Sequence, residues 1–278
     1  MTKSVRMTRR VGFSSGHRYW IPALSEQANL DLFGHWASPY NHGHNYVLDV
    51  QVEGLVDFKT GMVVNIKRID DVLRSAIVRQ FDGKSLNDQV SYFHDRSTSL
   101  ENLVVYVADC LAGDNVLPSE VRLTALRLEE MPTLFVELDL DRKPSLMTLT
   151  RTYEFAASHR LDSPHISQAE NLELFGKCNN AAGHGHNYLL EVTVSGEPDP
   201  KTGMILNLDD LDRTVSDLVV DRYDHKNLNV DIPEFEGKIT TSEIVALEIF
   251  ERLKSHLPAK LHRVRLHETA RNVFEVSA

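Results

Sequence analysis

The sequence predicts an α+β protein in which one ββααββ unit occurs twice in tandem. Identical residues recur at a constant separation of 142 positions along most of the chain, which indicates an internal duplication. In each copy, stretches in which apolar and polar residues alternate flank two stretches with helical spacing of apolar residues. Strands at both ends with helices between them are typical of an α+β unit, and 278 residues suit about two domains.

The duplication also suggests domain boundaries. A polar, proline-containing stretch at 141–145 separates the copies, so we expect repeat 1 to span residues 1–141 and repeat 2 to span residues 147–278. The matches are Phe13 with Phe155, His17 with His159, Arg18 with Arg160, the His-Gly-His-Asn-Tyr segments at 42–46 and 184–188, the Lys-Thr-Gly-Met segments at 59–62 and 201–204, and Glu101 with Glu243.

Two strands are expected to begin each repeat. The first ends at the first matched histidine, and the second begins at the His-Gly-His segment after a long polar loop. In repeat 2 the second strand shows the pattern of a half-buried strand, because Tyr188, Leu190 and Val192 alternate with Glu191 and Thr193.

Two helices and two closing strands are expected to complete each repeat. Apolar residues at helical spacing predict the first helix. These residues are Ile66, Ile69, Leu73 and Ile77 in repeat 1 and Leu208, Leu211, Val215 and Leu218 in repeat 2. The second helix is expected at 99–112 and 242–257, and the closing strands at 122–129, 134–140, 263–268 and 273–276.

Composition and charge exclude several classes of function. A formal net charge of −10 argues against a general binder of nucleic acid or anionic membranes, which needs clustered lysine and arginine. No apolar run approaches the roughly 18 residues of a membrane-spanning helix, and the basic start of the chain lacks the apolar core of a signal peptide. With Cys110 and Cys178 as the only cysteines, no disulfide framework is expected. We therefore expect a cytoplasmic protein.

Three histidines of repeat 2 are candidate metal ligands. His184 and His186 are two residues apart, so on an extended strand both side chains point to the same face. His159 ends the preceding strand, and pairing of the two strands would bring the three rings together. Three neutral imidazoles leave one position of a tetrahedral zinc ion free, which is the catalytic pattern. We therefore predict a catalytic zinc site.

Five motifs of repeat 2 are informative in combination. They are Ser158-His159-Arg160, Cys178 followed by five residues and His184-Gly185-His186-Asn187-Tyr188, Asp224-His225-Lys226-Asn227-Leu228-Asn229, Thr240-Thr241-Ser242-Glu243, and Glu268-Thr269-Ala270-Arg271-Asn272. Together they resemble the 6-pyruvoyltetrahydropterin synthase and 6-carboxytetrahydropterin synthase family of the tunnelling fold, over nearly all of each repeat. The resemblance implies antiparallel sheets that assemble into barrels, and a Zn2+ cofactor. It also implies site residues: His159, His184 and His186 as zinc ligands, Cys178, Asp224 and His225 as catalytic residues, and Thr241, Glu243 and Glu268 as substrate-binding residues.

The resemblance further implies a reaction on a small-molecule pterin, 7,8-dihydroneopterin triphosphate. Glu268 would accept the parallel N–H donors of the pterin edge, and zinc would lower the pKa of the side-chain hydroxyls. A Cys178 thiolate would remove a side-chain proton, while His225, oriented by Asp224, would deliver one elsewhere. The pyruvoyl enzyme thereby releases triphosphate with an internal redox rearrangement.

Repeat 1 keeps only part of this pattern. His17, His42 and His44 match the zinc ligands, and Glu130 matches Glu268 if a short deletion is allowed. However, Trp36 occupies the position of Cys178, and Gly83 occupies the position of His225; neither side chain transfers a proton near neutral pH. We expect repeat 1 to be a degenerate copy that can bind zinc and is retained for assembly.

The resemblance implies that active sites lie between neighbouring subunits. Single-unit members form hexamers of two stacked trimers, so three copies of this chain would supply six units. We therefore expect a homotrimer in which repeat 2 of one chain lies beside repeat 2 of another.

Alternative functions stay open. The five-residue gap after Cys178 and the Glu-Thr-x-x-Asn ending favour the pyruvoyl enzyme over the 6-carboxytetrahydropterin synthase of the queuosine pathway. A non-catalytic pterin- or purine-binding protein is an alternative from another class, and the retained Cys178, Asp224 and His225 argue against it. A cyclohydrolase-type zinc hydrolase fits less well, because its zinc usually takes cysteine ligands.

Overall fold

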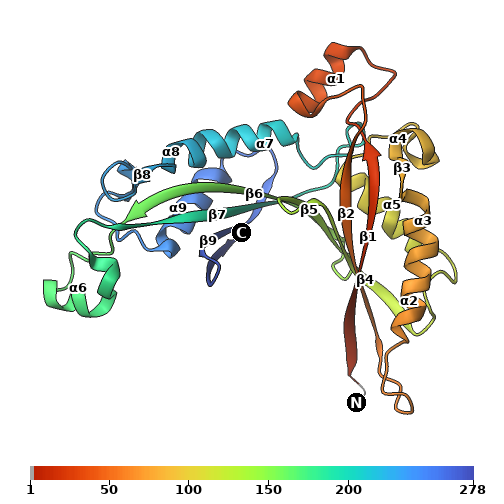
Figure 1. Ribbon diagram of the computed structural model, residues 1–278, viewed down its shortest axis with the longest axis horizontal. Coiled ribbons are helices and arrows are strands. Elements are labelled where there is room, and N and C mark those ends of the chain that lie inside the picture. The colour runs from red at the N-terminus through yellow and green to blue at the C-terminus, as the bar shows by residue number, and fades with distance from the viewer. Residues whose placement is uncertain (1–2) are drawn as a thin grey trace. The chain divides into compact units, whose positions relative to one another are not determined.

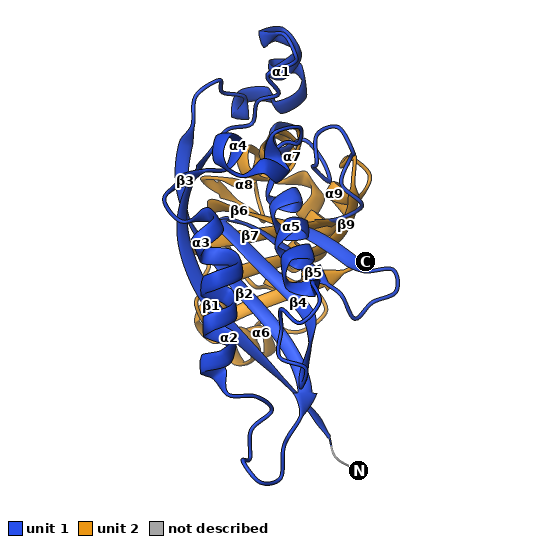
Figure 2. Ribbon diagram, turned by 90° about the vertical axis from the view of Figure 1, so that its right-hand side faces the viewer, with its two compact units in different colours: residues 1–149, 195–209 blue, residues 150–194, 210–278 orange. Residues whose placement is uncertain are grey.

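The structure is a computed structural model that describes residues 3–278 and divides into two compact units (Figures 1 and 2). Unit 1 comprises the chain up to Leu149 together with the segment Ser195–Asp209. Unit 2 comprises Thr150–Val194 and Asp210–Ala278. The segment 195–209 therefore belongs to repeat 2 in sequence but to unit 1 in space. No helix in the described part of the chain is both long and apolar enough to cross a membrane.

Unit 1 is built on an antiparallel sheet. β1 (Ser4–His17) pairs along its whole length with β2 (His42–Leu55), so that His17 lies opposite His42. β2 also pairs with β4 (Val121–Met131), and β4 pairs with β5 (Leu134–Asp139). A two-residue strand, β3 (Lys84–Ser85), runs parallel to β1. The four antiparallel strands lie near the positions that the sequence predicts.

Helices of unit 1 cover one face of this sheet (Figure 1). The first predicted helix extends to Phe81 and contains a π-helical turn in its middle. The second predicted helix packs against β4. The helical segments that follow β2 are α2 (Ile66–Leu73), the π turn Arg74–Val78, α3 (Arg79–Phe81), α4 (Leu86–Gln89), the 3-10 turn Ser91–Phe93 and α5 (Leu100–Ala112). The buried side chains of the two long helices include Ile69, Leu73, Ile77, Leu103, Val104 and Val107.

Repeat 2 supplies the same elements to unit 2, where the strand order is β10-β9-β7-β6 and β8 pairs with β6. The strands are β6 (Leu146–His159), β7 (His184–Ser195), β8 (Lys226–Asn227), β9 (Lys260–Thr269) and β10 (Asn272–Ser277). The helical segments that follow β7 are α7 (Leu208–Val215), the π turn Ser216–Val220, α8 (Asp221–Tyr223), the 3-10 turn Pro233–Phe235 and α9 (Ser242–Lys254). The α+β class predicted from the sequence is confirmed for both repeats.

The long polar loop expected between the first two strands contains a helix that the sequence analysis missed. In repeat 2 this helix exposes Leu172 and Leu174, which are 62% and 67% accessible. Because few of its residues are buried, it has no apolar face that a periodicity argument could detect. The elements are α1 (Glu26–Phe33) with the 3-10 turn Gly34–Trp36, and α6 (Gln168–Phe175) with the 3-10 turn Gly176–Asn179.

Two other predictions for repeat 2 are corrected. The last helix ends at Lys254 rather than at residue 257. On the preceding helix Val219 is fully buried, whereas Leu218 is only half-buried. The π turn widens the helix locally, so the buried positions Leu211, Val215 and Val219 follow a spacing of four residues.

Candidate active site

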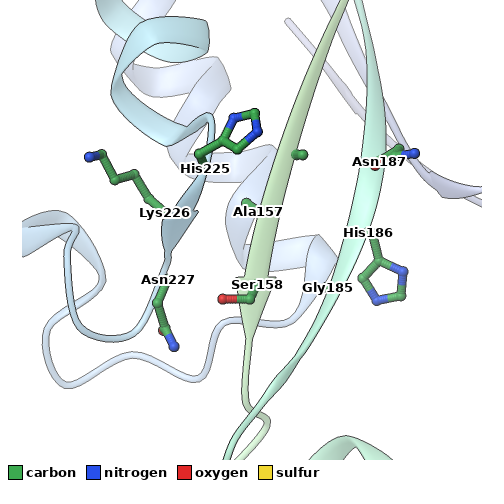
Figure 3. Close-up of a pocket in the computed structure, with 9 residues that line it drawn as sticks. Ala157, Ser158, Gly185, His186, Asn187, His225, Lys226 and Asn227 are labelled. Atoms are coloured by element: carbon green, nitrogen blue, oxygen red, sulfur yellow. The ribbon is translucent and has the colours of Figure 1, made fainter.

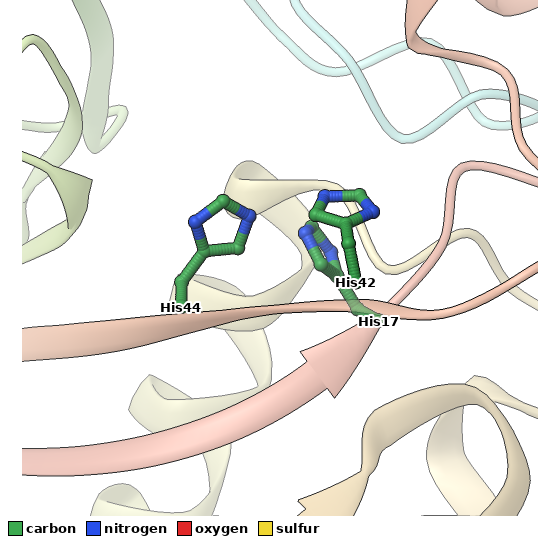
Figure 4. Close-up of side chains that lie close together, drawn as sticks. All are labelled: His17, His42 and His44. Atoms are coloured by element: carbon green, nitrogen blue, oxygen red, sulfur yellow. The ribbon is translucent and has the colours of Figure 1, made fainter.

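Each repeat contains a cluster of three histidines at the ends of its first two strands. In each cluster one nitrogen from every ring lies within 4.8 Å of the corresponding atoms of the other two. The ring centroids are 4.6 to 5.0 Å apart in repeat 1 (Figure 4) and 4.7 to 5.3 Å apart in repeat 2. The clusters are His17, His42 and His44, and His159, His184 and His186.

Strand geometry accounts for this convergence. His184 and His186 occupy alternate positions at the start of β7, so their rings share one face. His159 is the last residue of the neighbouring β6. The structure thus brings together the three imidazoles that the sequence analysis proposed as ligands.

Backbone carbonyls orient one ring in each cluster. Nδ1 of His159 lies 2.7 Å from the carbonyl oxygen of Thr240, and Nδ1 of His17 lies 3.2 Å from that of Thr98. Since a carbonyl only accepts, Nδ1 carries the hydrogen and the lone pair of Nε2 faces the cluster. Among residues 3–278, neither Nε2 atom has a hydrogen-bond partner, although both are buried. A metal ion would satisfy these nitrogens, so the residues fit one.

Burial favours the neutral form of five of these imidazoles. It lowers the pKa of His17 to about 3 and that of His44 to about 4, and neighbouring rings add to the effect. Burial also lowers the pKa values of His42, His159 and His184. Neutral imidazole is the form that binds a metal, so no proton has to be displaced near neutral pH.

Glu268 places a carboxylate beside the cluster of repeat 2. Its Oε1 lies 4.0 Å from Nε2 of His159 and 3.8 Å from Nε2 of His186. Ser242 Oγ donates to Oε1 at 2.6 Å, and Asn272 Nδ2 donates to Oε2 at 3.1 Å. Burial raises the pKa of Glu268, but these hydrogen bonds and the nearby rings outweigh it, so the pKa lies below its usual value. The carboxylate is therefore ionised and held in one orientation.

Sequence reasoning named Glu268 but not the two residues that hold it. Ser242 and Asn272 both lie within the quoted motifs, at the start of α9 and after the tight turn of the last hairpin. The signal was therefore present in the sequence, but only the fold shows that the two motifs meet.

Glu130 is the counterpart in repeat 1, and its surroundings differ. Its carboxylate oxygens lie 3.7 Å from Nε2 of His17 and 3.4 Å from Nε2 of His44, and the residue is 2% exposed. Leu100 occupies the position of Ser242, so an apolar side chain replaces the serine hydroxyl at this position. The two clusters therefore share the imidazoles and differ at the carboxylate.

The expected proton-transfer residues Cys178 and His225 do not belong to the histidine cluster of repeat 2. Cys178 lies in the 3-10 turn after α6 and is half-buried, outside the group of three histidines. His225 is 83% exposed at a pocket of about 490 Å³ formed by β6, β7 and β8. In Figure 3 its ring lies beside β6, whereas the His186 ring extends beyond β7. Within the described residues, neither side chain therefore belongs to this cluster.

The Asp224–His225 pair is nevertheless tightly built. Asp224 Oδ2 lies 2.7 Å from Nδ1 of His225, and Oδ1 accepts the N–H of Ala156 at 2.7 Å. The Ala156 N–H, followed by His225, holds the pKa of Asp224 below its usual value. His225 has a φ of 57°, in the left-handed region that disfavours a side chain, while its counterpart Gly83 has a φ of 72°. A strained histidine at a glycine position indicates a functional constraint.

Thr241 and Glu243 lie at the start of α9. Thr241 is the N-cap of α9 and accepts the N–H of Ile244, while Glu243 is exposed. The counterpart of Glu243 is Glu101, which is 1% exposed and accepts the N–H of Ile205 at 2.9 Å. Burial raises the pKa of Glu101 to about 7. The same position is thus covered in repeat 1 and open in repeat 2.

Comparison with known proteins matches this organisation. The family model described as 6-pyruvoyl tetrahydropterin synthase matches residues 6–141 and again residues 148–278. The chain is 48% identical over 126 residues to the 6-pyruvoyl tetrahydrobiopterin synthase of Homo sapiens, covering 45% of this chain and 87% of that protein. It is 26% identical over 149 residues to the 6-carboxy-5,6,7,8-tetrahydropterin synthase of Rickettsia conorii, covering 48% of this chain and 99% of that protein. A solved structure of Caenorhabditis elegans 6-pyruvoyl tetrahydropterin synthase is 44% identical, with a TM-score of 0.46, and covers 48% of this chain and 96% of that chain.

Proposed function

We propose that this chain, which belongs to the 6-pyruvoyl tetrahydropterin synthase family, is a zinc-dependent tetrahydropterin synthase. It converts 7,8-dihydroneopterin triphosphate to 6-pyruvoyltetrahydropterin and releases triphosphate. The observation that carries the proposal is the hydrogen-bonded Glu268 carboxylate beside three clustered imidazoles in repeat 2. The high identity to proteins named as 6-pyruvoyl tetrahydrobiopterin synthases supports it.

Glu268 is the proposed anchor of the pterin ring. A pterin presents its amino group and a ring N–H side by side, and an ionised carboxylate accepts both. The bonds from Ser242 and Asn272 fix the carboxylate before substrate binds, so little orientation is lost on binding. Thr241 and Glu243 remain proposed contacts at the adjacent helix start.

His159, His184 and His186 would hold zinc, which, when bound, supplies a Lewis acid that makes the hydroxyls of the substrate side chain more acidic. The orphaned Nε2 of His159 supports this assignment. His17, His42 and His44 would hold a second ion in repeat 1. Since repeat 1 has Trp36 and Gly83 in place of the two proton-transfer residues, we propose that its site does not turn over substrate.

Cys178 and His225 are the proposed proton-transfer groups. Cys178 as thiolate takes a proton from a carbon of the substrate side chain, and the bond to the triphosphate oxygen breaks. His225, whose Nδ1 is fixed by Asp224, exchanges protons through its exposed Nε2. The side-chain carbons end as carbonyls while the ring is reduced, so no external redox partner is required. The separation of the two groups within one chain supports a homotrimer in which one chain supplies His225 to the Cys178 site of another.

The test is turnover of 7,8-dihydroneopterin triphosphate by the zinc-loaded protein, with products identified by mass and Cys178→Ala as the control. A 6-pyruvoyl tetrahydropterin with stoichiometric triphosphate, absent from the control, is the expected result. A 6-carboxy product with acetaldehyde would assign the protein to the other synthase of the family instead. Tight pterin binding without turnover by both proteins would contradict the enzyme proposal and indicate a binding protein.

A further inference from the structure

The side chain of Asn229 binds both backbone groups of Arg160, the residue that follows His159. The N–H of Arg160 donates to Oδ1 of Asn229 at 2.7 Å, and Nδ2 of Asn229 donates to the carbonyl oxygen of Arg160 at 3.0 Å. β6 ends at His159, so Arg160 lies just beyond the paired part of the strand. The amide of Asn229 therefore takes the place of a strand partner and holds the backbone beside the histidine cluster.

Thr240 connects this pair to the His159 ring. Its hydroxyl lies 3.3 Å from the carbonyl oxygen of Arg160 and 3.2 Å from Oδ1 of Asn229. Its own carbonyl oxygen lies 2.7 Å from Nδ1 of His159 and accepts the ring N–H. Thr240 is fully buried, which strengthens these hydrogen bonds. We call Asn229, Thr240 and the backbone of Arg160 the histidine clamp.

Repeat 1 contains the same clamp. Asn87 accepts the N–H of Arg18 at 2.9 Å and donates to the carbonyl oxygen of Arg18 at 3.1 Å. The Thr98 hydroxyl donates to the carbonyl oxygen of Arg18 at 3.0 Å, and the carbonyl oxygen of Thr98 faces Nδ1 of His17. The clamp thus occurs twice in the chain, with the same residue types in the same contacts.

The two clamps share their backbone contacts but not the contacts of their arginine side chains. The guanidinium of Arg18 pairs with Asp88 at 2.7 and 2.9 Å. That of Arg160 donates to the carbonyl oxygen of Asn179 and to Asp162, each at 3.2 Å. Both repeats therefore preserve the hold on the backbone next to the first histidine, while the arginine side chains bind different partners.

The clamp accompanies the histidines rather than the proton-transfer residues. Repeat 1 lacks counterparts of Cys178 and His225 in its sequence, yet it has all three histidines and the clamp. Asn229 is exposed, so its side chain adds little to the apolar core. The histidine that the clamp holds explains this exposed amide better than packing does.

We propose that Asn229 is a positioning residue for the metal ion of repeat 2, and Asn87 for that of repeat 1. Through Arg160 and Thr240, the clamp fixes the direction in which the buried Nε2 of His159 presents its lone pair. Outer partners of metal-bound histidines change metal affinity by about 10- to 100-fold when they are substituted. The inference rests on the metal assignment of the proposed function, and not on the reaction.

Zinc affinity, measured by competition with a chelator, tests the proposal. The His42→Ala protein isolates the repeat 2 site, and in it Asn229→Ala is expected to weaken zinc binding at least about tenfold. Asp199→Ala is the matched control, because Asp199 accepts two backbone N–H groups at 3.0 and 2.9 Å but lies beyond the end of β7 opposite to His184. Unchanged affinity in Asn229→Ala, or an equal loss in Asp199→Ala, would overturn the proposal.

Two substitutions of Thr240 separate positioning from general stability. Thr240→Ser keeps the hydroxyl and loses a buried methyl group, whereas Thr240→Val keeps the volume and loses the hydroxyl. Both are expected to lower the free energy of unfolding, but only Thr240→Val is expected to weaken zinc binding, by about tenfold. If the two variants bind zinc equally well, the clamp acts only through stability and the proposal is wrong.

The ring proton of His159 gives a readout that does not depend on metal affinity. In metal-free protein with isotope-labelled histidine, the Nδ1–H that donates to Thr240 is expected to exchange with solvent faster in Asn229→Ala than in its parent. Unchanged exchange would contradict the clamp. A His42→Ala protein that binds no zinc would instead contradict the metal assignment, and this inference with it.

Discussion

Single residues distinguish the two repeats more than their backbones do. Both keep three histidines at the same strand ends and a carboxylate beside them. The differences are Trp36 for Cys178, Gly83 for His225 and Leu100 for Ser242. Each replaces a group that exchanges a proton or donates a hydrogen bond with one that does not. The backbone is thus preserved where the proposed chemistry is lost.

Two substitutions of His225 separate its role in catalysis from the free-energy cost of its positive φ. We expect both His225→Gly and His225→Ala to lose most of the synthase activity. His225→Gly removes a left-handed side-chain residue and is expected to be about 1 kcal/mol more stable than His225→Ala. Activity assays and urea denaturation check this pair. Retained activity in either variant would mean that another group transfers the proton.

Metal content reports the two clusters separately. The wild-type protein is expected to bind about two zinc ions per chain, and His184→Ala and His42→Ala about one each, because every ring supplies one ligand. Only His184→Ala is expected to abolish turnover. Metal analysis after dialysis measures the first outcome. A His42→Ala protein without activity would show that the cluster of repeat 1 matters for catalysis.

The pKa of Glu101 makes stability depend on pH. Burial raises it from 4.5 to about 7, so the folded state holds a proton that the unfolded state releases. The contribution of Glu101 to the free energy of unfolding is therefore fully present below about pH 4.5. It falls by roughly 2 to 3 kcal/mol as the pH rises to about 7. Glu101→Gln keeps an acceptor for Ile205 and is expected to remove this loss. Denaturation at pH 5 and pH 8 compares the two proteins; equal losses would refute the assignment.

At the scale of elements, α6 positions the turn that carries Cys178. Ser167 and Glu170 form a complete capping box, since the Ser167 side chain accepts the Glu170 N–H and the Glu170 side chain accepts the Ser167 N–H. The equivalent helix of repeat 1 has only a Ser25 cap, without the return bond. The helix beside the proposed catalytic thiol is thus the better anchored of the two.

Removal of the caps tests this difference. Ser167→Ala is expected to cost about 1 kcal/mol of local stability, and Ser25→Ala less, because only the former breaks a reciprocal pair. Amide hydrogen exchange of α6 and α1 measures the local effect directly. A drop in kcat for Ser167→Ala, with zinc content unchanged, is expected to accompany faster exchange of α6. Unchanged exchange in α6 would show that other contacts hold the turn.

At the scale of the whole molecule, we propose that a second chain completes the active site. Among the described residues, Cys178 and His225 lie outside the histidine cluster of repeat 2, and the His225 side chain is exposed. The exposure of His225 supports this proposal. The assembly would supply the proton-transfer partner.

Complementation between inactive chains tests shared sites. Cys178→Ala and His225→Ala proteins are each expected to be inactive. When unfolded together and reassembled in equal amounts, they are expected to recover about a quarter of wild-type activity, because random mixing gives that share of sites one intact copy of each group. A mixture that stays inactive, although mass spectrometry shows mixed assemblies, would place both groups of a site in one chain.

The parts of the candidate site that depend on the spacing of nearby residues were predictable from the sequence. The spacing of His184 and His186 on a strand determines their common face, and the duplication with its motifs led to the family and to the α+β unit. The helix α6 was missed because it exposes Leu172 and Leu174 and so has no buried face to detect. Ser242 and Asn272 could not be linked to Glu268, because contacts between distant segments leave no periodicity.

The sequence by itself determined the duplication, the family, the α+β class and the identity of the imidazoles. Only the tertiary structure decided which groups meet. It placed the segment 195–209 with unit 1, buried Glu101 while leaving Glu243 exposed, and separated His225 from its own histidine cluster. The physical reason is that local pattern sets which face a side chain takes, whereas burial and hydrogen bonding depend on what the rest of the chain brings against that face.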